Sequence, residues 1–226
     1  RQARRAEKSG DQYEKLIAKG LKLCTDRDYR RAIKAYYEAI ELEPEMPSAY
    51  YNLADTLNRA ERKPQAAEMF LKASELYSRG AYAKLEAWAN ATASAFHLLK
   101  HPDCDEIPKP DWWNDKDLKA ISKRVLAAAS EHIAAYNMRA TVLAGPYSSC
   151  SVCWEAGPRT VSEVREAAAL HQRAAQIDRL SASDPFPATL CGVAPRAPMR
   201  IRSERRRSSR DDTQLRERHS AVCATT

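Results

Sequence analysis

Residues 29–73 of the chain read YRRAIKAYYEAIELEPEMPSAYYNLADTLNRAERKPQAAEMFLKA. An alanine, an aromatic residue and a second alanine follow one another in this stretch at spacings of four and three residues, and the whole pattern recurs 34 residues later. The positions related by this offset are Gly20 with Ala54, Leu23 with Leu57, Ala32 with Ala66, Tyr36 with Phe70, and Ala39 with Ala73. A period of this length is typical of helix pairs that stack in a solenoid.

The repeated residues have the sizes that stacked helix pairs need. A helix pair buries little apolar surface alone, so each pair must pack on the next one. We expect small residues where helices cross and aromatic rings in the space between units. Gly20 would cost about 1 kcal/mol relative to alanine inside an exposed helix, so it predicts a close crossing. The predicted packing residues are Gly20, Ala32, Tyr36, Ala39, Ala54, Ala66, Phe70 and Ala73.

Residues 13–80 resemble two tetratricopeptide repeats (TPR). The positions that carry the resemblance are Gly20, Tyr29, Ala32, Tyr36, Ala39, Pro44, Tyr50, Leu53, Ala54, Leu57, Ala66, Phe70 and Ala73. Lys19 and Ser78 depart from the leucine and proline that the family prefers. The resemblance implies a non-catalytic scaffold whose concave groove binds a peptide or a helix of another protein.

Composition predicts an all-α fold, a TPR-like solenoid with two regular repeats, one or two irregular ones and a disordered tail. Alanine is abundant and only six glycines occur in 226 residues, which favours helices over strands. We expect a flexible lead-in at 1–10, two TPR units at 11–80, irregular helical repeats with proline-rich and Ser/Cys loops at 81–178, and an Arg/Ser/Pro-rich disordered tail at 179–226. The tail carries ten basic against five acidic side chains, and therefore most of the net charge of +7.

Residues 81–178, which we call the irregular half, do not repeat the alanine–aromatic–alanine pattern of the second helices at the next 34-residue step. The apolar spacing in this half nevertheless predicts more helices. We expect one over residues 85–99, one capped by Asn114 or Asp115, one that ends near Gly145, and one over residues 161–177 in which His171 packs between helices. We expect Trp112 and Trp113 to cover the open hydrophobic end of the solenoid. Residues 110–115 and 154–159 also resemble segments of uncharacterised TPR-containing proteins of unicellular algae.

No residue pattern predicts catalysis, a cofactor or a metal site. Cys150 and Cys153 form a C-x-x-C pair without a second ligand pair, so we interpret them as loop thiols. The scattered cysteines favour reduced thiols and a cytoplasmic protein, with the nucleus as the alternative. The start at Arg1 indicates an incomplete N-terminus. An enzyme whose catalytic domain lies outside this chain is a further alternative.

The resemblance to tetratricopeptide repeats implies that the first helices of the two repeats line the groove. The predicted groove residues are Ile17, Leu21, Cys24, Tyr51, Asn52, Asp55 and Asn58. This mixed set lacks the positive charge that a carboxylate clamp requires, and it favours a peptide or protein partner bound by apolar and hydrogen-bonding contacts. The alternative is an RNA-associated factor in which the Arg-rich tail contacts phosphate. No apolar run is long enough to span a membrane.

Overall fold

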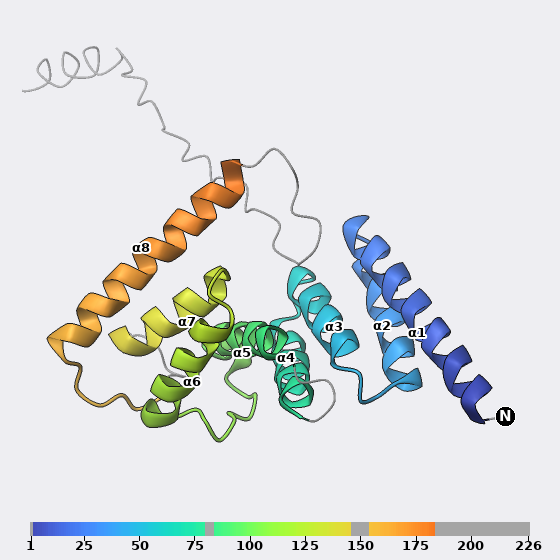
Figure 1. The fold of residues 1–226 in the computed structure, drawn as a ribbon, viewed down its shortest axis with the longest axis horizontal. Coiled ribbons are helices and arrows are strands. Elements are labelled where there is room, and N and C mark those ends of the chain that lie inside the picture. Colours follow the sequence, from blue (N-terminus) through green and yellow to red (C-terminus); the bar gives the residue numbers. More distant parts are fainter. Residues whose placement is uncertain (1, 80–83, 146–153, 184–226) are drawn as a thin grey trace, which may run out of the picture. The chain divides into compact units, whose positions relative to one another are not determined.

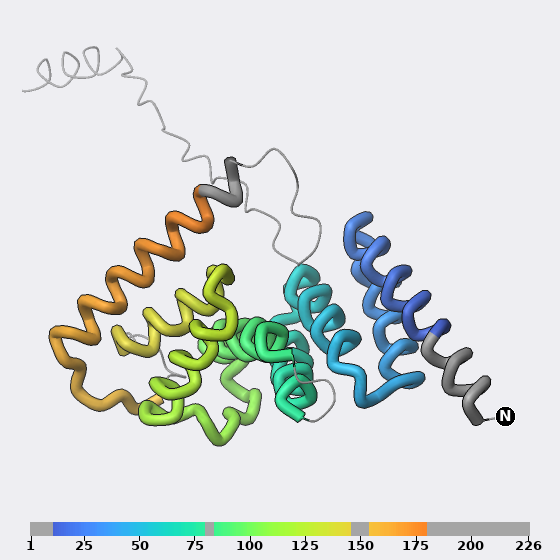
Figure 2. Tube along the Cα trace, in the orientation of Figure 1, coloured from blue at the N-terminus to red at the C-terminus, as the bar shows by residue number. Residues whose placement is uncertain are grey.

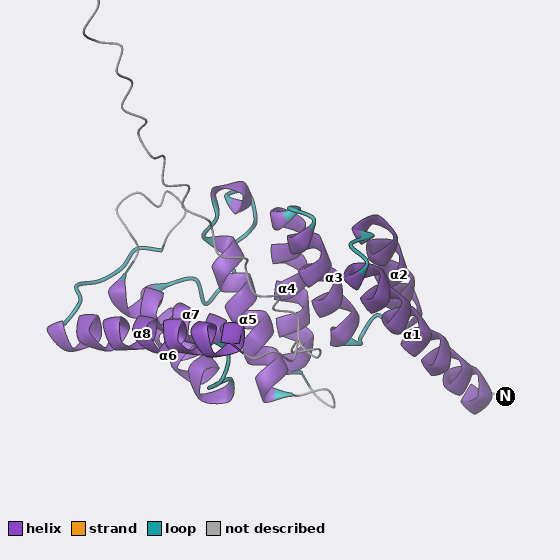
Figure 3. Ribbon diagram, turned by 90° about the horizontal axis from the view of Figure 1, so that it is seen from above, coloured by secondary structure: helices purple, strands orange, loops and turns teal. Residues whose placement is uncertain are grey.

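The chain is described by a computed structural model at residues 2–79, 84–145 and 154–183. These residues form helices and loops without a strand (Figures 1 and 3), so the predicted all-α fold class is confirmed. The elements are α1 (Gln2–Thr25), α2 (Tyr29–Leu42), α3 (Pro47–Arg59), α4 (Lys63–Ser78), α5 (Leu85–Leu99), the 3₁₀ helix η2 (Pro102–Cys104), α6 (Asp115–Ala128), α7 (Ile133–Ala144) and α8 (Val161–Ser183).

Two expected boundaries differ from the observed helices. α1 begins at Gln2, so the segment that we expected to be a lead-in is helical. α8 continues to Ser183, beyond the expected start of the tail at residue 179. The tail from residue 184 and the Cys150/Cys153 loop lie outside the described residues.

The turns inside the two regular helix pairs lie 34 residues apart and have the same backbone geometry. Arg27 after α1 and Glu61 after α3 both have positive φ, at 62° and 59°. In the first turn the N–H of Asp28 donates to the carbonyl of Leu23, and in the second the N–H of Arg62 donates to that of Leu57. Such a bond, together with a left-handed residue, closes a helix in a Schellman motif. The two pairs are therefore built by the same local geometry.

Polar and proline residues mark most helix starts as the sequence predicts. The side chain of Asn114 accepts a hydrogen bond from the N–H of Asp117 and caps α6, and Pro64 lies in the first turn of α4. Ser48 is of a residue type that favours N-caps, but it does not cap α3, whose N-cap makes no side-chain hydrogen bond. Met46 is the N-cap, and the Ser48 hydroxyl instead lies 2.6 Å from the Tyr13 hydroxyl of α1. The Ser48 side chain therefore makes a tertiary contact between α1 and α3 in place of a local cap.

The α1–α2 crossing explains the glycine inside α1. A β-carbon at Gly20 would lie 2.5 Å from Cε1 and 2.6 Å from Cζ of the Tyr36 ring. Tyr36 is fully buried, so its ring has no space into which to move. All the predicted packing residues are buried, namely Gly20, Ala32, Tyr36, Ala39, Ala54, Ala66, Phe70 and Ala73.

The buried residues form two hydrophobic clusters that share α5. The first cluster is built by α1 to α5, and the second by α5, α6, α7 and Trp154. Successive helices pack on one another along the chain, including α4 on α5 and α7 on α8. The order of the helices can be followed along the trace in Figure 2. Because α5 contributes to both clusters, it connects the regular pairs to the irregular half.

Two expectations about the irregular half are wrong. Trp112 and Trp113 pack against both clusters and therefore do not cover an end. The Trp113 ring lies 5.4 Å from Phe96 and 5.9 Å from Trp154, measured between centroids. His171 is exposed on α8, while Ala167 and Ala174 of the same helix are buried. α8 has a packed face and an exposed face. The two alanines lie on the packed face, and His171 lies on the exposed one.

A polar network fastens the segment before α8 to α6. The Arg159 guanidinium donates to both carboxylate oxygens of Asp115, at 2.8 and 2.5 Å, and also to the carbonyl of Val142. The indole N–H of Trp154 donates to the same carboxylate at 3.1 Å. These bonds from Arg159 and Trp154, with the nearby charges, lower the pKa of Asp115 to about 2. The network therefore holds residues 154–159 in place against α6.

We predict that Gly20→Ala destabilises the protein although alanine is the better helix former. Moving the Tyr36 ring away from the new methyl group should cost about 1–3 kcal/mol. Thermal or urea unfolding followed by circular dichroism measures the loss. In the same helix, the exposed Ala18→Gly should cost about 1 kcal/mol through helix propensity alone. A Gly20→Ala variant as stable as the wild type would contradict the crossing, and adding Tyr36→Leu should recover part of the loss.

We predict that acid weakens the network through Asp115. Its pKa in the folded protein is below the ordinary 3.8, so its contribution is complete above pH 3.8 and is lost as the pH falls toward 2. The loss is on the order of 1–2 kcal/mol. Urea unfolding at several pH values should show that Asp115→Asn lacks this part of the pH dependence. The exposed Asp111→Asn should keep it, and equal profiles for the wild type and Asp115→Asn would contradict the prediction.

Candidate functional site

The predicted groove residues lie on α1 and α3, the first helices of the two regular pairs. We call the surface that they form the α1–α3 face. Its residues are Ile17, Leu21 and Cys24 from α1, and Tyr51, Asn52, Asp55 and Asn58 from α3. They differ widely in exposure, so they do not contribute equally to a binding surface.

Leu21 is the most accessible apolar residue of this face. Its exposed fraction is 50%, which is high for a leucine in a helix packed on its neighbours. Ile17, one turn earlier, is buried in the first hydrophobic cluster and offers little surface to a ligand. Tyr51 is half-buried, and its ring meets Phe70 edge-on with 5.4 Å between centroids. Leu21 therefore supplies the open apolar contact, while Tyr51 serves partly as a core residue.

The polar part of the face contains an ion pair. The Arg59 guanidinium donates to Asp55 at 2.8 Å, and both side chains are about three-quarters buried. Burial raises the pKa of Asp55, and the charge of Arg59 partly offsets this effect. Cys24 and Thr56 bring α1 and α3 together, since the Thr56 hydroxyl lies 3.6 Å from Sγ of Cys24. Asn58 is exposed at the end of α3. The face thus carries paired charge and hydrogen-bonding groups on α3, and an exposed leucine on α1.

The ion-pair partner Arg59 and the exposed Leu85 of α5 were not among the predicted groove residues. Arg59 was not predicted, although its spacing of four from Asp55 is the usual one for a helical ion pair. Leu85, in the first turn of α5, has an exposed fraction of 62%. It stands 34 residues after Tyr51 and 68 after Ile17, so continuing the period along the first helices would have identified it.

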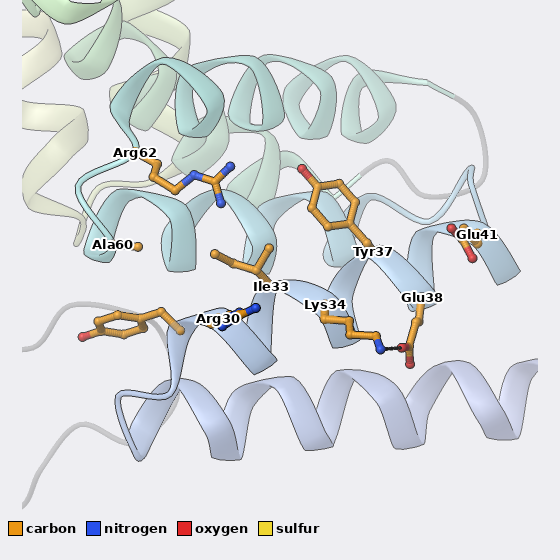
Figure 4. Close-up of a pocket in the computed structure, with 9 residues that line it drawn as sticks. Arg30, Ile33, Lys34, Tyr37, Glu38, Glu41, Ala60 and Arg62 are labelled. Carbon is orange, nitrogen blue, oxygen red and sulfur yellow. Dashed lines mark ion pairs between the residues drawn. The ribbon is translucent and has the colours of Figure 1, made fainter.

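A second surface feature lies on α2, the second helix of the first pair. A depression of about 630 Å³ is bordered by α2 and by the turn between α3 and α4 (Figure 4). Its lining residues are Tyr29, Arg30, Ile33, Lys34, Tyr37, Glu38, Glu41, Ala60 and Arg62. None of them belongs to the α1–α3 face. No pattern in the sequence predicted this depression.

The described residues show no arrangement suited to a metal. Within them, no group of three or more His, Cys, Asp and Glu side chains could hold a metal ion. Cys24 and Cys104 are free thiols, and burial raises the pKa of Cys104. No helix in the described parts of the chain is long and apolar enough to cross a membrane.

Comparison with known proteins supports the repeat interpretation. Residues 24–89 match the sequence model of the Tetratricopeptide repeat family, and no curated protein is similar to the chain in sequence. The resemblance to algal proteins therefore stays a prediction.

Among the solved structures that are similar to the chain are the MamA RS-1 ArsTM double mutant and YrrB. The MamA RS-1 ArsTM double mutant is 15% identical, with 76% of this chain and 78% of that chain covered and a TM-score of 0.46. YrrB, described as a TPR protein with an unusual peptide-binding site, is 17% identical, with coverages of 72% and 84% and a TM-score of 0.29. Similarity at this level does not transfer the properties of either protein to this chain. The helical pairs and the family match together identify residues 24–89 as a tetratricopeptide repeat segment within an all-α, TPR-like solenoid.

Proposed function

We propose that the protein is a non-catalytic scaffold that binds a peptide or helix of another protein on the α1–α3 face. The observation that carries this proposal is the exposed fraction of 50% at Leu21 on α1, in a pair of helices whose other predicted groove residues on α3 are polar or half-buried. Burying the rest of a half-exposed leucine contributes about 1–2 kcal/mol, and the polar groups would fix the orientation of the bound segment.

The charges of the face favour an apolar segment over a strongly charged one. Asp55 is already paired with Arg59, so neither is available to a ligand without breaking a partly buried ion pair. Breaking such a pair leaves a charge poorly compensated. A peptide that places an apolar side chain on Leu21 and hydrogen-bonds to Asn52 or Asn58 meets no such cost. We expect an affinity of roughly micromolar strength, because the surface has few large anchors.

The absence of catalysis is part of this proposal and rests on the kind of surface present. The α1–α3 face has no nucleophile held by a base, and its acid is occupied by Arg59. TPR segments commonly hold other polypeptides, and the family match at residues 24–89 is consistent with that role. The partner's chemistry follows from the face itself, namely an apolar contact flanked by amide donors and acceptors.

We predict that Leu21→Asp weakens partner recovery about tenfold, as expected for the loss of about 1.4 kcal/mol of contact energy. The full chain, tagged and immobilised, is used as bait in a lysate of its source cells, and bound proteins are quantified by mass spectrometry. Leu21 is a better target than Tyr51, because Tyr51→Ala would also remove the edge-on contact with Phe70 from the core.

The control for this experiment is Val164→Asp on α8. Val164 is also 50% exposed, so the substitution introduces the same charge on an equally open helical position away from the α1–α3 face. Both variants should keep the helical circular dichroism of the wild type. If the folded Leu21→Asp variant recovers the same proteins in the same amounts, the α1–α3 face is not the binding site.

A further inference from the structure

The outer face of α2 carries a stripe of six residues that all line the depression shown in Figure 4. They follow one another at helical spacings of three, one, three, one and three residues, so they lie on one side of the helix. We call them the α2 stripe: Arg30, Ile33, Lys34, Tyr37, Glu38 and Glu41.

The charges of the α2 stripe change sign along the helix. Its first half carries Arg30 and Lys34, and its second half carries Glu38 and Glu41. Among the described residues, Arg30 and Glu41 take part in no ion pair, and the Lys34–Glu38 pair is long at 3.9 Å and mostly exposed. Between the charges the Tyr37 side chain is 42% exposed, while Ile33 is buried in the first hydrophobic cluster. The stripe is thus one open aromatic residue between a basic end and an acidic end.

This order of charges is unfavourable for α2 alone. A helix has a partial positive charge at its N-terminus and a partial negative charge at its C-terminus, so acids favour the first turn and bases the last. α2 has no acid in its first turn and no base in its last turn. Arg30 and Glu41 instead stand where the helix dipole opposes them. A partner that brings the opposite sign to each end would relieve both interactions.

We propose that the α2 stripe is a self-association surface, on which α2 of a second copy lies antiparallel to the first. A twofold axis at the middle of α2 would place Arg30 opposite Glu41 of the second copy, and Glu41 opposite its Arg30. Such an interface is isologous, because the same patch serves both copies. The two helix dipoles also run in opposite directions, so each basic end meets the C-terminal end of the other helix.

The charge pattern distinguishes a second copy from other occupants. A uniformly acidic segment would be attracted by Arg30 and Lys34 but repelled by Glu38 and Glu41, and a basic segment would meet the reverse problem. A parallel pairing of two copies would put like charges together. A partner with the same charge order, laid antiparallel, matches both ends, and a second copy has this order by construction.

The expected dimer is weak and sensitive to salt. α2 has 14 residues and is therefore roughly 21 Å long, so one helix pair buries less than the roughly 1,200 Å² of a stable interface. Its charged contacts are exposed, and raising the ionic strength from about 0.05 M to about 0.5 M screens them strongly. We therefore expect dimers at roughly 10–300 µM protein in low salt, and mostly monomers in high salt.

Charge reversal tests the pairing by sedimentation velocity on the full chain. Arg30→Glu and Glu41→Lys, made singly, each place like charges opposite one another and should shift the protein to monomer across this range. The double variant Arg30→Glu/Glu41→Lys exchanges the two signs and should restore the dimer. Both substitutions agree with the helix dipole, so we expect the variants to fold as the wild type does, as circular dichroism would show.

The controls change charge by the same amount elsewhere. Lys22→Glu on α1 and Glu106→Lys after η2 alter exposed residues that have no ion pair within the described parts of the chain, and both should associate as the wild type does. A wild-type chain that stays monomeric at about 300 µM in low salt would overturn the proposal. Single variants that dimerise normally, or a double variant that stays monomeric, would do the same.

Discussion

The structure depends first on the contact between Gly20 of α1 and the ring of Tyr36 of α2. The ring occupies the space that a β-carbon at position 20 would need, since the two would be 2.5 Å apart. Glycine at this position therefore lets the two helices approach closely without displacing the ring. The contact between Gly20 and the Tyr36 ring also fixes how α2 is rotated about its own axis. With Tyr36 turned toward α1, the residues from Arg30 to Glu41 that lie on the other side of α2 face outward and line the depression.

A second constraint is the position of α5 between the two hydrophobic clusters. Ten of its 15 residues are buried, so the helix has little free surface and cannot separate from either side without exposing apolar area. Phe96 extends this role through aromatic contacts, because its ring lies 5.4 Å from Trp113 and 5.8 Å from Trp154. The Asp115–Arg159 network then holds the segment that carries Trp154. The irregular half is thus attached to the regular pairs through side-chain packing, without the 34-residue repeat.

The candidate binding surfaces follow from these constraints to different degrees. The sequence pattern placed all seven predicted groove residues on the first helices of the pairs, and that placement needs only the period. It could not rank them, because exposure depends on what neighbouring helices cover. Ile17 turned out to be buried, Leu21 half-exposed, and Asp55 occupied by Arg59. Leu85 could have been included by extending the register of Ile17 and Tyr51 to α5, although the second helix of that unit does not repeat.

The sequence by itself determined the fold class, the bounds of α5, the starts of α6 and α8, the end of α7 and the positions of close crossings. Spacings of three and four residues, caps such as Asn114 and a glycine among helix formers are local signals, and local physics decides them. Only the tertiary structure decided that Ser48 bonds to Tyr13, that Trp113 lies between clusters, that His171 faces outward and that one side of α2 stays open. These outcomes depend on which distant segments come together, and no spacing within a single helix encodes that.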